Sequence, residues 1–472
     1  MRHFPQLVAL AYLGAVVLFI FGIRLLGSAA TARRGNWLAA VGMLLALIVT
    51  FVGLGTLPWE AVLPALAVGA VVGTGAARAV RMTAMPQMVA LFNGMGGGAA
   101  ALIGAGEFIR RAAQLSASQA TLNPQRSVPI MIACLIGTVS FSGSLIAFSK
   151  LQGVMRGTPI TFPRQRWANA ALLALILALG VIVIAAHSNP WLLGLFELLV
   201  LAFGVAFVLP VGGADMPVII SLLNSFTGLA AAISGFVLGN EVLIVAGALV
   251  GASGTILTQL MSRAMNRSLA NVLFSGFGSQ AAAVGDGEGV DRTVHSVGAE
   301  DVAMLLGYAR QVIFVPGYGM AVAKAQHDVR ELASQLEKRG VQVKYAIHPV
   351  AGRMPGHMNV LLAEADVPYT QLYEMDDINP DFARTDVAVV IGANDVTNPA
   401  ARNTPSSPIY GMPILNVDQA EHVVVLKRSM NPGFAGIENE LYYNPKTLML
   451  FGDARDSVVQ LMGALKELVP TR

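Results

Sequence analysis

The uneven distribution of acidic residues constrains this chain more than any other feature of its sequence. Of 28 Asp and Glu residues in 472 positions, only five precede position 263: Glu60, Glu107, Glu197, Asp215 and Glu241. A charge at the centre of a bilayer costs about 3 kcal/mol or more, so a long stretch nearly free of carboxylates is typical of a membrane domain. The acid-rich remainder is typical of a water-soluble domain. Overall, 12% of residues are charged, against about 25% in soluble proteins.

Nine apolar runs are long enough to cross a bilayer, which takes about 20 residues. We expect spans at about 7–26, 37–57, 61–79, 86–105, 128–149, 168–186, 191–210, 217–238 and 242–261. The first run has no small-residue cleavage site after it and is interpreted as a retained span. Trp37, Trp59, Trp167 and Trp191 all fall at span ends, as expected for an aromatic belt.

The connections between the spans differ in basic residues. One set holds eleven Lys or Arg residues, including Arg33, Arg78 and Lys150, and the other holds four. Basic loops stay on the cytoplasmic side, so we expect the N-terminus in the periplasm of a bacterial inner membrane and the C-terminal domain in the cytoplasm. The basic excess therefore indicates topology in a lipid bilayer and gives no reason to expect a nucleic-acid partner.

Polar residues within the predicted spans are candidates for function, because they are costly there. Asp215 and Asn224 lie across the start of the eighth span, where a functional role and a structural one are both plausible. Glu197 is interpreted as an acid near the headgroups. The glycine cluster at 94–98 indicates a flexible or closely packed point. Cys134, the single cysteine, is expected to be a buried apolar residue. No histidine lies well inside a span.

The predicted organisation is a membrane domain at 1–262, a linker at 263–294 and a soluble domain at 295–472. Residues 275–290 are rich in Gly, Ala and acids, as flexible linkers are. Beyond them, strands are expected at 311–315, 341–347, 387–391, 413–417, 422–427 and 446–451, and helices at 319–338, 357–366 and 454–468. This alternation predicts an α/β doubly wound, Rossmann-like domain.

A glycine-rich turn follows the first of these strands and opens a helix: Gly317, Tyr318, Gly319, Met320, Ala321 and Val322. Such a turn lets backbone approach a pyrophosphate and places the ligand at a helix N-terminus. Val322 stands where a third glycine is usual. The context of strand, turn and helix makes dinucleotide binding the expected role, although Gly-x-Gly alone marks many ordinary turns.

The end of the second strand favours NADP over NAD. An NAD site usually carries an acid there for the ribose hydroxyls, whereas this chain has Lys344, His348 and Arg353 and no acid between 338 and 363. Lys427 and Arg428 form a second basic pair at a strand end. A 2′-phosphate requires cations of this kind. Loops 392–399 and 429–436 also follow strands, and the second is a candidate lid.

Five stretches carry a resemblance to a known family. They are PGYGMAVAKAQ (316–326), IHPVAGRMPGHMNVLLAEA (347–365), IGANDVTNPAA (391–401), KRSMNPGFAG (427–436) and, in the membrane part, GGADMPVIISLLNS (212–225). The chain resembles, over essentially its whole length, the β subunits of proton-translocating NAD(P)⁺ transhydrogenases.

The resemblance implies an enzyme that moves hydride from NADH to NADP⁺ and couples this to inward proton flow. It implies that this chain binds NADP(H), that α subunits carry the NAD(H) site and the remaining spans, and that two protomers form a dimer. Arg353, Lys427 and Arg428 match the 2′-phosphate and pyrophosphate region, and Asp395 matches an acid near the nicotinamide that we name as the catalytic candidate. Further cofactor contacts are expected at the 317–322 turn and at Val350, Ala351, Gly352, Gly392, Ala393, Asn394, Ser429, Met430, Asn431, Gly433, Ala435, Gly436 and Asp453.

The proton path is expected to involve Asn93, Ser144, Asp215 and Asn224. Asn93 departs from the family pattern, because some members have a histidine there and asparagine cannot titrate near neutral pH. The relay histidine then comes from a partner subunit, or the path is water-based. An alternative function is an ion transporter or channel with a cytosolic nucleotide-sensing domain, although such domains commonly keep the acid missing here. No metal site is expected.

Overall fold

The structure is a computed structural model. It describes the chain except for residues 1–4, 55–58, 82–83, 119–123, 158, 186–188, 213–214, 266–292, 355, 408, 434 and 469–472. Two compact units are present, Met1–Gln259 and Leu260–Arg472, and each is described by itself. Most of the predicted linker lies outside the described residues.

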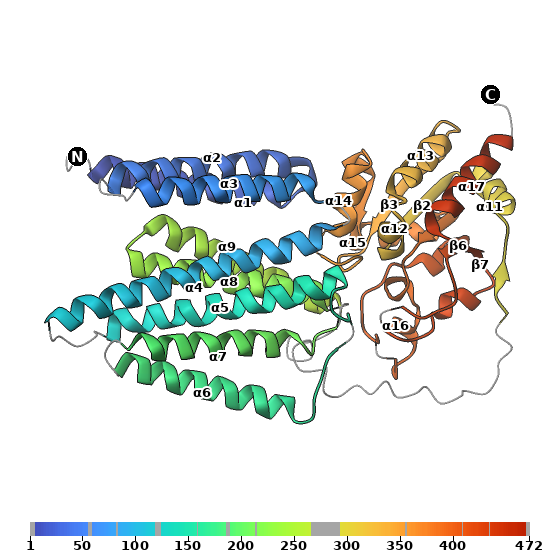
Figure 1. Ribbon diagram of the computed structural model, residues 1–472. Coiled ribbons are helices and arrows are strands. Elements are labelled where there is room, and N and C mark those ends of the chain that lie inside the picture. Colours follow the sequence, from blue (N-terminus) through green and yellow to red (C-terminus); the bar gives the residue numbers. More distant parts are fainter. Residues whose placement is uncertain are drawn as a thin grey trace. The chain divides into compact units, whose positions relative to one another are not determined.

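The first unit is helical, and nine of its described helices are long and apolar enough to cross a membrane (Figure 1). They are α1 (Pro5–Leu26), α2 (Ala29–Leu54), α3 (Trp59–Ala79), α4 (Met85–Ser118), α5 (Pro124–Gln152), α6 (Gln165–Ala185), α7 (Pro190–Val208), α8 (Met216–Leu238) and α9 (Glu241–Ala264). The prediction of about nine spans is therefore confirmed. Helix α5 packs against α4, α7 and α8, so it lies at the centre of this group.

Glycines set the distance between the central helices. A Cβ atom added to Gly97 would lie 2.8 Å from the Gly137 carbonyl oxygen, and one added to Gly137 would lie 2.7 Å from that of Gly97. Helix α4 nevertheless continues without a break through this region. The 94–98 cluster is thus a point of close packing between α4 and α5, of the kind that small residues allow in membranes.

The second unit holds a seven-stranded sheet in which all strand pairs are parallel. Its strands are β1 (His295–Ser296), β2 (Gln311–Pro316), β3 (Gln342–Ile347), β4 (Leu372–Glu374), β5 (Val387–Ile391), β6 (His422–Lys427) and β7 (Thr447–Phe451), in the order β1-β7-β6-β5-β2-β3-β4. The chain leaves β2 in one direction through β3 and β4, then returns to β5 on its other side. Ligands of open α/β sheets bind at the carboxyl ends of the strands beside such a switch point.

Helices and irregular segments cover both faces of this sheet. The helices are α11 (Ala299–Tyr308), α12 (Tyr318–Ala323), α13 (Gln326–Glu337), α14 (His357–Glu364), α15 (Met375–Ile378), α16 (Ala400–Asn403) and α17 (Ala454–Glu467). Val312 and Phe314 of β2 are buried in one core with α11, α13 and α17, and Ile313 and Val315 in a second core on the opposite face. Alternate residues therefore enter different cores, and the predicted doubly wound α/β class is confirmed.

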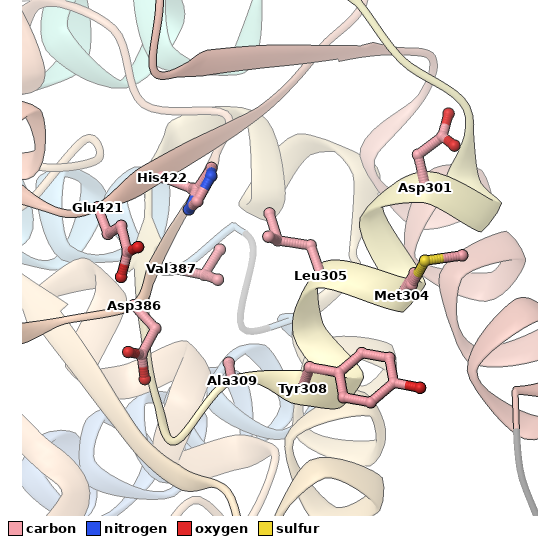
Figure 2. A pocket seen from close by; sticks show the side chains of 9 residues that line it. All are labelled: Asp301, Met304, Leu305, Tyr308, Ala309, Asp386, Val387, Glu421 and His422. Carbon is pink, nitrogen blue, oxygen red and sulfur yellow. The ribbon is translucent and has the colours of Figure 1, made fainter.

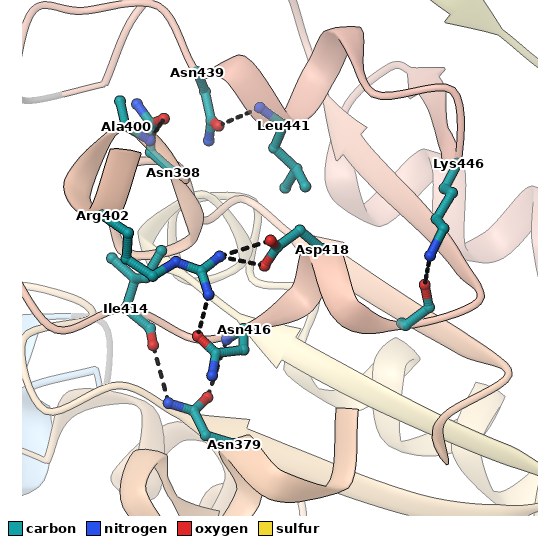
Figure 3. Close-up of polar contacts among 11 residues, drawn as sticks. Asn379, Asn398, Ala400, Arg402, Ile414, Asn416, Asp418, Asn439, Leu441 and Lys446 are labelled. Atoms are coloured by element: carbon teal, nitrogen blue, oxygen red, sulfur yellow. Dashed lines mark hydrogen bonds and ion pairs between the residues drawn. The ribbon is translucent and has the colours of Figure 1, made fainter. Parts of the chain in front are cut away.

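The predicted strand at 413–417 is wrong. Its backbone is satisfied by side chains and loops, since Asn379 donates its amide to the Ile414 carbonyl and accepts from the Asn416 amide, both at 3.0 Å (Figure 3). Pro413 has no N–H to give to a sheet. Arg402 then fixes the segment through Asp418 at 2.6 Å and Asn416 at 3.0 Å.

The helix predicted at 319–338 is two helices, α12 and α13, separated at Lys324. This residue has a φ of 55°, a left-handed conformation that ends a helix. The short strands β1 and β4 were not predicted, because two- and three-residue strands leave no period in a sequence. Helix α11 was not predicted either.

Candidate functional site

The loops that follow β2 and β5 are packed backbone to backbone at the switch point. Gly317 N–H donates to the Ile391 carbonyl and Gly319 N–H to the Gly392 carbonyl, each at 2.9 Å. A Cβ atom on Gly317 would lie 2.4 Å from Ala393 Cα, a distance that no side chain tolerates. These glycines therefore allow two loops of the sheet to approach each other closely, whereas the sequence predicted a close approach to a pyrophosphate.

Helix α12 is only six residues long, so the expected long helix behind the fingerprint is absent. The aromatic residue of the turn, Tyr318, contacts a cation from another loop. The Arg353 guanidinium lies over the Tyr318 ring, 4.5 Å from its centroid. Burial raises the pKa of Tyr318, and the charge of Arg353 opposes this shift. This stacking brings the loop after β3 against the turn after β2, which places two predicted binding segments side by side.

Two buried histidines shape the loop that carries Arg353. His357 Nδ1 accepts from the Arg353 amide at 3.0 Å, and His348 Nδ1 accepts from the Val350 amide at 3.2 Å. An accepting Nδ1 places the proton of a neutral imidazole on Nε2, so His348 Nε2 donates to the Pro413 carbonyl at 2.9 Å. Burial lowers the pKa of both histidines to about 4, so they are neutral scaffolding groups at physiological pH.

Gly352 lets this loop close on His357. Its φ is 109°, and a Cβ atom there would lie 2.4 Å from His357 Nδ1. Ala351 is buried beside it, and Val350 packs on the second core. The sequence pointed to residues 350–353 only as ligand contacts. Their arrangement around a buried imidazole has no sequence signal other than the histidine itself.

The candidate lid contacts Asp395. The Asp395 Oδ2 atom accepts from the Ala435 amide at 2.9 Å, and Gly433 approaches so closely that a Cβ atom there would lie 2.5 Å from Asp395 Oδ1. Lys427 holds the start of the lid by donating to the Asn431 carbonyl at 2.6 Å. Burial lowers the pKa of Lys427, and the negative charge of Asp395 opposes this shift. The described lid residues are therefore closed onto the carboxylate.

Asn394, beside Asp395, is held by two donors. Its Oδ1 atom accepts from the Tyr442 hydroxyl at 2.9 Å and from Asn439 Nδ2 at 3.1 Å. Its own Nδ2 is buried and has no hydrogen-bond partner among the described residues, and the same is true of His357 Nε2. Two buried N–H donors at the carboxyl edge are thus left for groups that the described residues do not supply.

Three residues that the sequence analysis assigned to the cofactor site have other contacts or lie exposed. Lys344 is buried and its ammonium group pairs with Asp381 at 2.5 Å, which commits its charge within the protein. Asp453 caps α17 by accepting from the Arg455 amide at 3.0 Å. Arg428 is exposed beyond the end of β6. The cation that contacts the fingerprint turn is therefore Arg353, with Lys427 at the lid.

A pocket of about 390 Å³ lies at the opposite edge of the sheet. Figure 2 shows its lining, which includes the first residues of β5 and β6, Val387 and His422, and Tyr308 of α11. Ligands of parallel sheets bind at the carboxyl edge, so this pocket is separate from the candidate site. No group of three or more His, Cys, Asp or Glu side chains that could hold a metal ion occurs in the described part of the chain.

In the membrane unit, predicted polar residues meet between α4, α5 and α8. Asn93 Nδ2 donates to Ser144 Oγ at 2.9 Å, and a weaker contact of 3.4 Å joins it to Ser140. Ser140 lies 2.6 Å from the Thr227 hydroxyl. Sequence reasoning named Asn93 and Ser144 but missed Ser140 and Thr227, since isolated hydroxyl residues are common in membrane helices.

The other predicted polar residues lie on α7 and α8 and share no hydrogen bond with this network among the described contacts. Asp215 is buried at the start of α8, and Asn224 is half-buried on the same helix. Glu197 was expected to face the headgroups. It is instead half-buried and accepts from the Thr138 hydroxyl at 2.5 Å, so it lies in the contact between α7 and α5.

Comparisons with known proteins agree with this arrangement. Residues 8–464 match the family described as NAD(P) transhydrogenase beta subunit. Two curated relatives, both named NAD(P) transhydrogenase subunit beta and both from Rhodospirillum rubrum, are each 50% identical over 459 residues, which cover 96% of this chain and 98% of the relative. A match of this length and identity includes both units, and the chain belongs to the NAD(P) transhydrogenase beta subunit family.

Proposed function

We propose that this chain is the NADP(H)-binding and proton-translocating subunit of a transhydrogenase. In this proposal, hydride passes from NADH, held by α subunits, to NADP⁺ held here, and the reaction is coupled to inward proton movement. NADP⁺, when bound, supplies the nicotinamide ring that accepts the hydride. The observation that carries the proposal is the Arg353–Tyr318 contact at the β2–β5 switch point, close to where the second strand of an NAD site usually ends in an acid.

The residues at the carboxyl edge fit a phosphorylated dinucleotide. Arg353 and Lys427 supply positive charge for phosphates, and the unpartnered donors Asn394 Nδ2 and His357 Nε2 are suited to polar atoms of a ligand. The role of Asp395 in this proposal is to hold the closed lid through the Ala435 amide. Protonation would weaken it as an acceptor, so Asp395 links lid position to a proton.

The Asn93, Ser144, Ser140 and Thr227 contacts support a proton path in the membrane unit. Hydroxyl and amide groups can relay protons only with water or with a titratable neighbour. We therefore propose that the α subunits complete this path, that two protomers form the assembly, and that the soluble unit faces the cytoplasm while the N-terminus faces the periplasm.

The proposal is tested in membrane vesicles that contain this chain and its α subunits. Reduction of an NADP analogue by NADH is measured with and without an imposed proton gradient. Reduction that accelerates under an inward gradient is the expected result. Reduction that ignores the gradient would remove the coupling claim. Ion flux without any reduction would favour the channel with a nucleotide-sensing domain.

A further inference from the structure

Lys150 is a buried cation near the end of α5. Only 4% of the residue is exposed. Its Nζ donates to the Leu209 carbonyl at 2.5 Å and to the Val211 carbonyl at 2.7 Å. Leu209 is the C-cap of α7, and Val211 lies in the turn between α7 and α8. The ammonium group therefore joins α5 to the turn that leads into α8.

Two physical effects stabilise the contacts of Lys150 with the end of α7. The carboxyl end of a helix carries a partial negative charge, and a cation placed there is stabilised. A buried ammonium also requires hydrogen-bond acceptors, because it has lost its water. Gln165 and Asn169 of α6 donate to the Ala206 carbonyl, each at 3.3 Å. Those neutral contacts hold the last turn of α7, whereas Lys150 extends beyond it to Val211.

Lys150 differs from the other cations on the elements around this turn. Arg156 and Arg164 on the α5–α6 connection, Arg166 at the start of α6 and Arg263 near the end of α9 are all exposed. Arginine keeps its charge at any pH relevant to an enzyme. Lys150 is thus buried where these arginines are exposed, and its two contacts hold Leu209 and Val211 at the start of the α7–α8 turn.

The turn ends at Asp215. The Asp215 amide donates to the Gly212 carbonyl at 3.1 Å, and the Asp215 carbonyl accepts from the Val218 and Ile219 amides at 3.1 and 3.2 Å. Val211, whose carbonyl accepts from Lys150, therefore directly precedes Gly212, whose carbonyl accepts from the Asp215 amide. The helix that starts here also carries the Leu223 carbonyl and the Thr227 hydroxyl, both of which contact Ser140.

We propose that Lys150 is a positioning residue for proton transfer at Asp215. It fixes Leu209 and Val211 against α5, so that the buried carboxyl group keeps one place relative to the polar contacts among α4, α5 and α8. Lys150 acts through the Val211–Gly212 backbone, to which the Asp215 amide is hydrogen-bonded, and need not touch the proton. The inference rests on the proposed function and on the expectation from the sequence that Asp215 belongs to the proton path, because it assigns Lys150 a part in the coupling step.

The test uses the complete enzyme with α subunits in vesicles and compares four variants. Lys150→Met keeps the length of the side chain and removes its donors and charge. Lys150→Arg keeps both, and Lys150→Gln keeps donors at shorter reach without charge. Asn169→Leu is the matched control, since it removes a cap of α7 that does not reach the turn. The pH profile of NADP-analogue reduction is measured with and without a proton gradient.

Lys150→Met is expected to lower the gradient-driven rate at least about tenfold, since a small misplacement of a reacting group has effects of this size. It should also shift the pH profile, while the KM for the NADP analogue stays within about twofold of the parent. Lys150→Arg should recover most of the rate, and Asn169→Leu should keep the parental profile.

The inference is overturned if Lys150→Met keeps the parental profile and gradient response, or if Asn169→Leu reproduces its loss. If the Lys150→Met enzyme does not assemble, Lys150→Gln takes its place. It is compared with Lys150→Arg, and the same outcomes support or overturn the inference. A parent enzyme without any gradient response would instead remove the proposed function, so the two failures are distinguishable.

Discussion

The guanidinium of Arg353 stacks on the ring of Tyr318, 4.5 Å from its centroid. These residues come from different loops, one after β3 and one after β2. Because the ring fixes the cation at the switch point, we propose that Arg353 is preorganised to bind a phosphate. We expect the pair to determine which dinucleotide binds.

The first prediction concerns this pair. Arg353→Ala should weaken NADP binding by roughly tenfold to a hundredfold, because a charge-assisted hydrogen bond contributes about 1.5–3 kcal/mol. Binding of NAD, which lacks the 2′-phosphate, should change much less. Tyr318→Phe keeps the ring and serves as the control with near-parental affinity. Titration calorimetry with both nucleotides measures the difference, and an equal loss for NADP and NAD would contradict the 2′-phosphate assignment.

The second prediction concerns the packing of the loops after β2 and β5. Gly392 has a φ of 66°, and a Cβ atom there would lie 2.4 Å from Gly319 Cα, whereas Gly340, with a φ of 87°, has open space around it. Gly340→Ala should lower the free energy of unfolding by about 1 kcal/mol, the cost of the conformation alone. Gly392→Ala should lower it by about 3 kcal/mol or more, because backbone must also move.

Urea unfolding of a fragment covering residues 293–472 measures these changes. Both hydrophobic cores of the sheet lie within this range, so we expect the fragment to fold alone. Equal losses for the two alanine variants would show that the loops can separate at little cost.

The third prediction concerns pH. Burial lowers the pKa of His348 and His357 to about 4 in the folded chain, from an ordinary value of 6.5. Between these values the unfolded chain binds protons that the folded chain does not, so stability rises with pH. The contribution of the histidines is complete above about pH 6.5 and is lost progressively as the pH falls toward 4.

Urea unfolding of the same fragment at a series of pH values checks this slope. His348→Gln should reduce it, since glutamine does not titrate. His422, at the other end of the sheet and half-exposed, provides the control substitution to glutamine. A parental slope in His348→Gln would mean that other groups cause the acid sensitivity.

Much of the fold follows from the sequence, for physical reasons visible in particular residues. Apolar runs near 20 residues have few alternatives to spanning helices, and buried parallel strands such as Val387–Ile391 are continuous apolar runs. The segment at 413–417 looks the same, but Pro413 and the side chain of Asn379 direct its backbone elsewhere. Local composition cannot reveal such a distant partner.

The residues proposed for the candidate site could be named from the sequence, whereas their contacts with one another could not. Gly317 and Gly392 were both recognised, yet their packing against each other depends on the strand order. Lys344 was counted with the basic residues of the site, and only the fold shows that Asp381 holds its charge. Ser140 and Thr227 became visible only when three helices were brought together.

The last prediction concerns the lid. Asp395 Oδ2 accepts from the Ala435 amide at 2.9 Å, and a protonated carboxyl is a weaker acceptor than a carboxylate. In the parent enzyme, NADPH release should therefore accelerate when Asp395 takes up a proton. Asp395→Asn presents a neutral amide at every pH, so release should be fast and should vary little across roughly pH 6 to 9.

Stopped-flow fluorescence of bound NADPH in the complete enzyme measures this release. Asp418→Asn is the matched control, because Asp418 forms an ion pair with Arg402 at 2.6 Å (Figure 3) and lies outside the 429–436 lid. The control should keep the parental pH dependence. Release from Asp395→Asn that follows the parental rate across the whole range would show that the lid is held by other contacts, and that Asp395 does not link it to the proton.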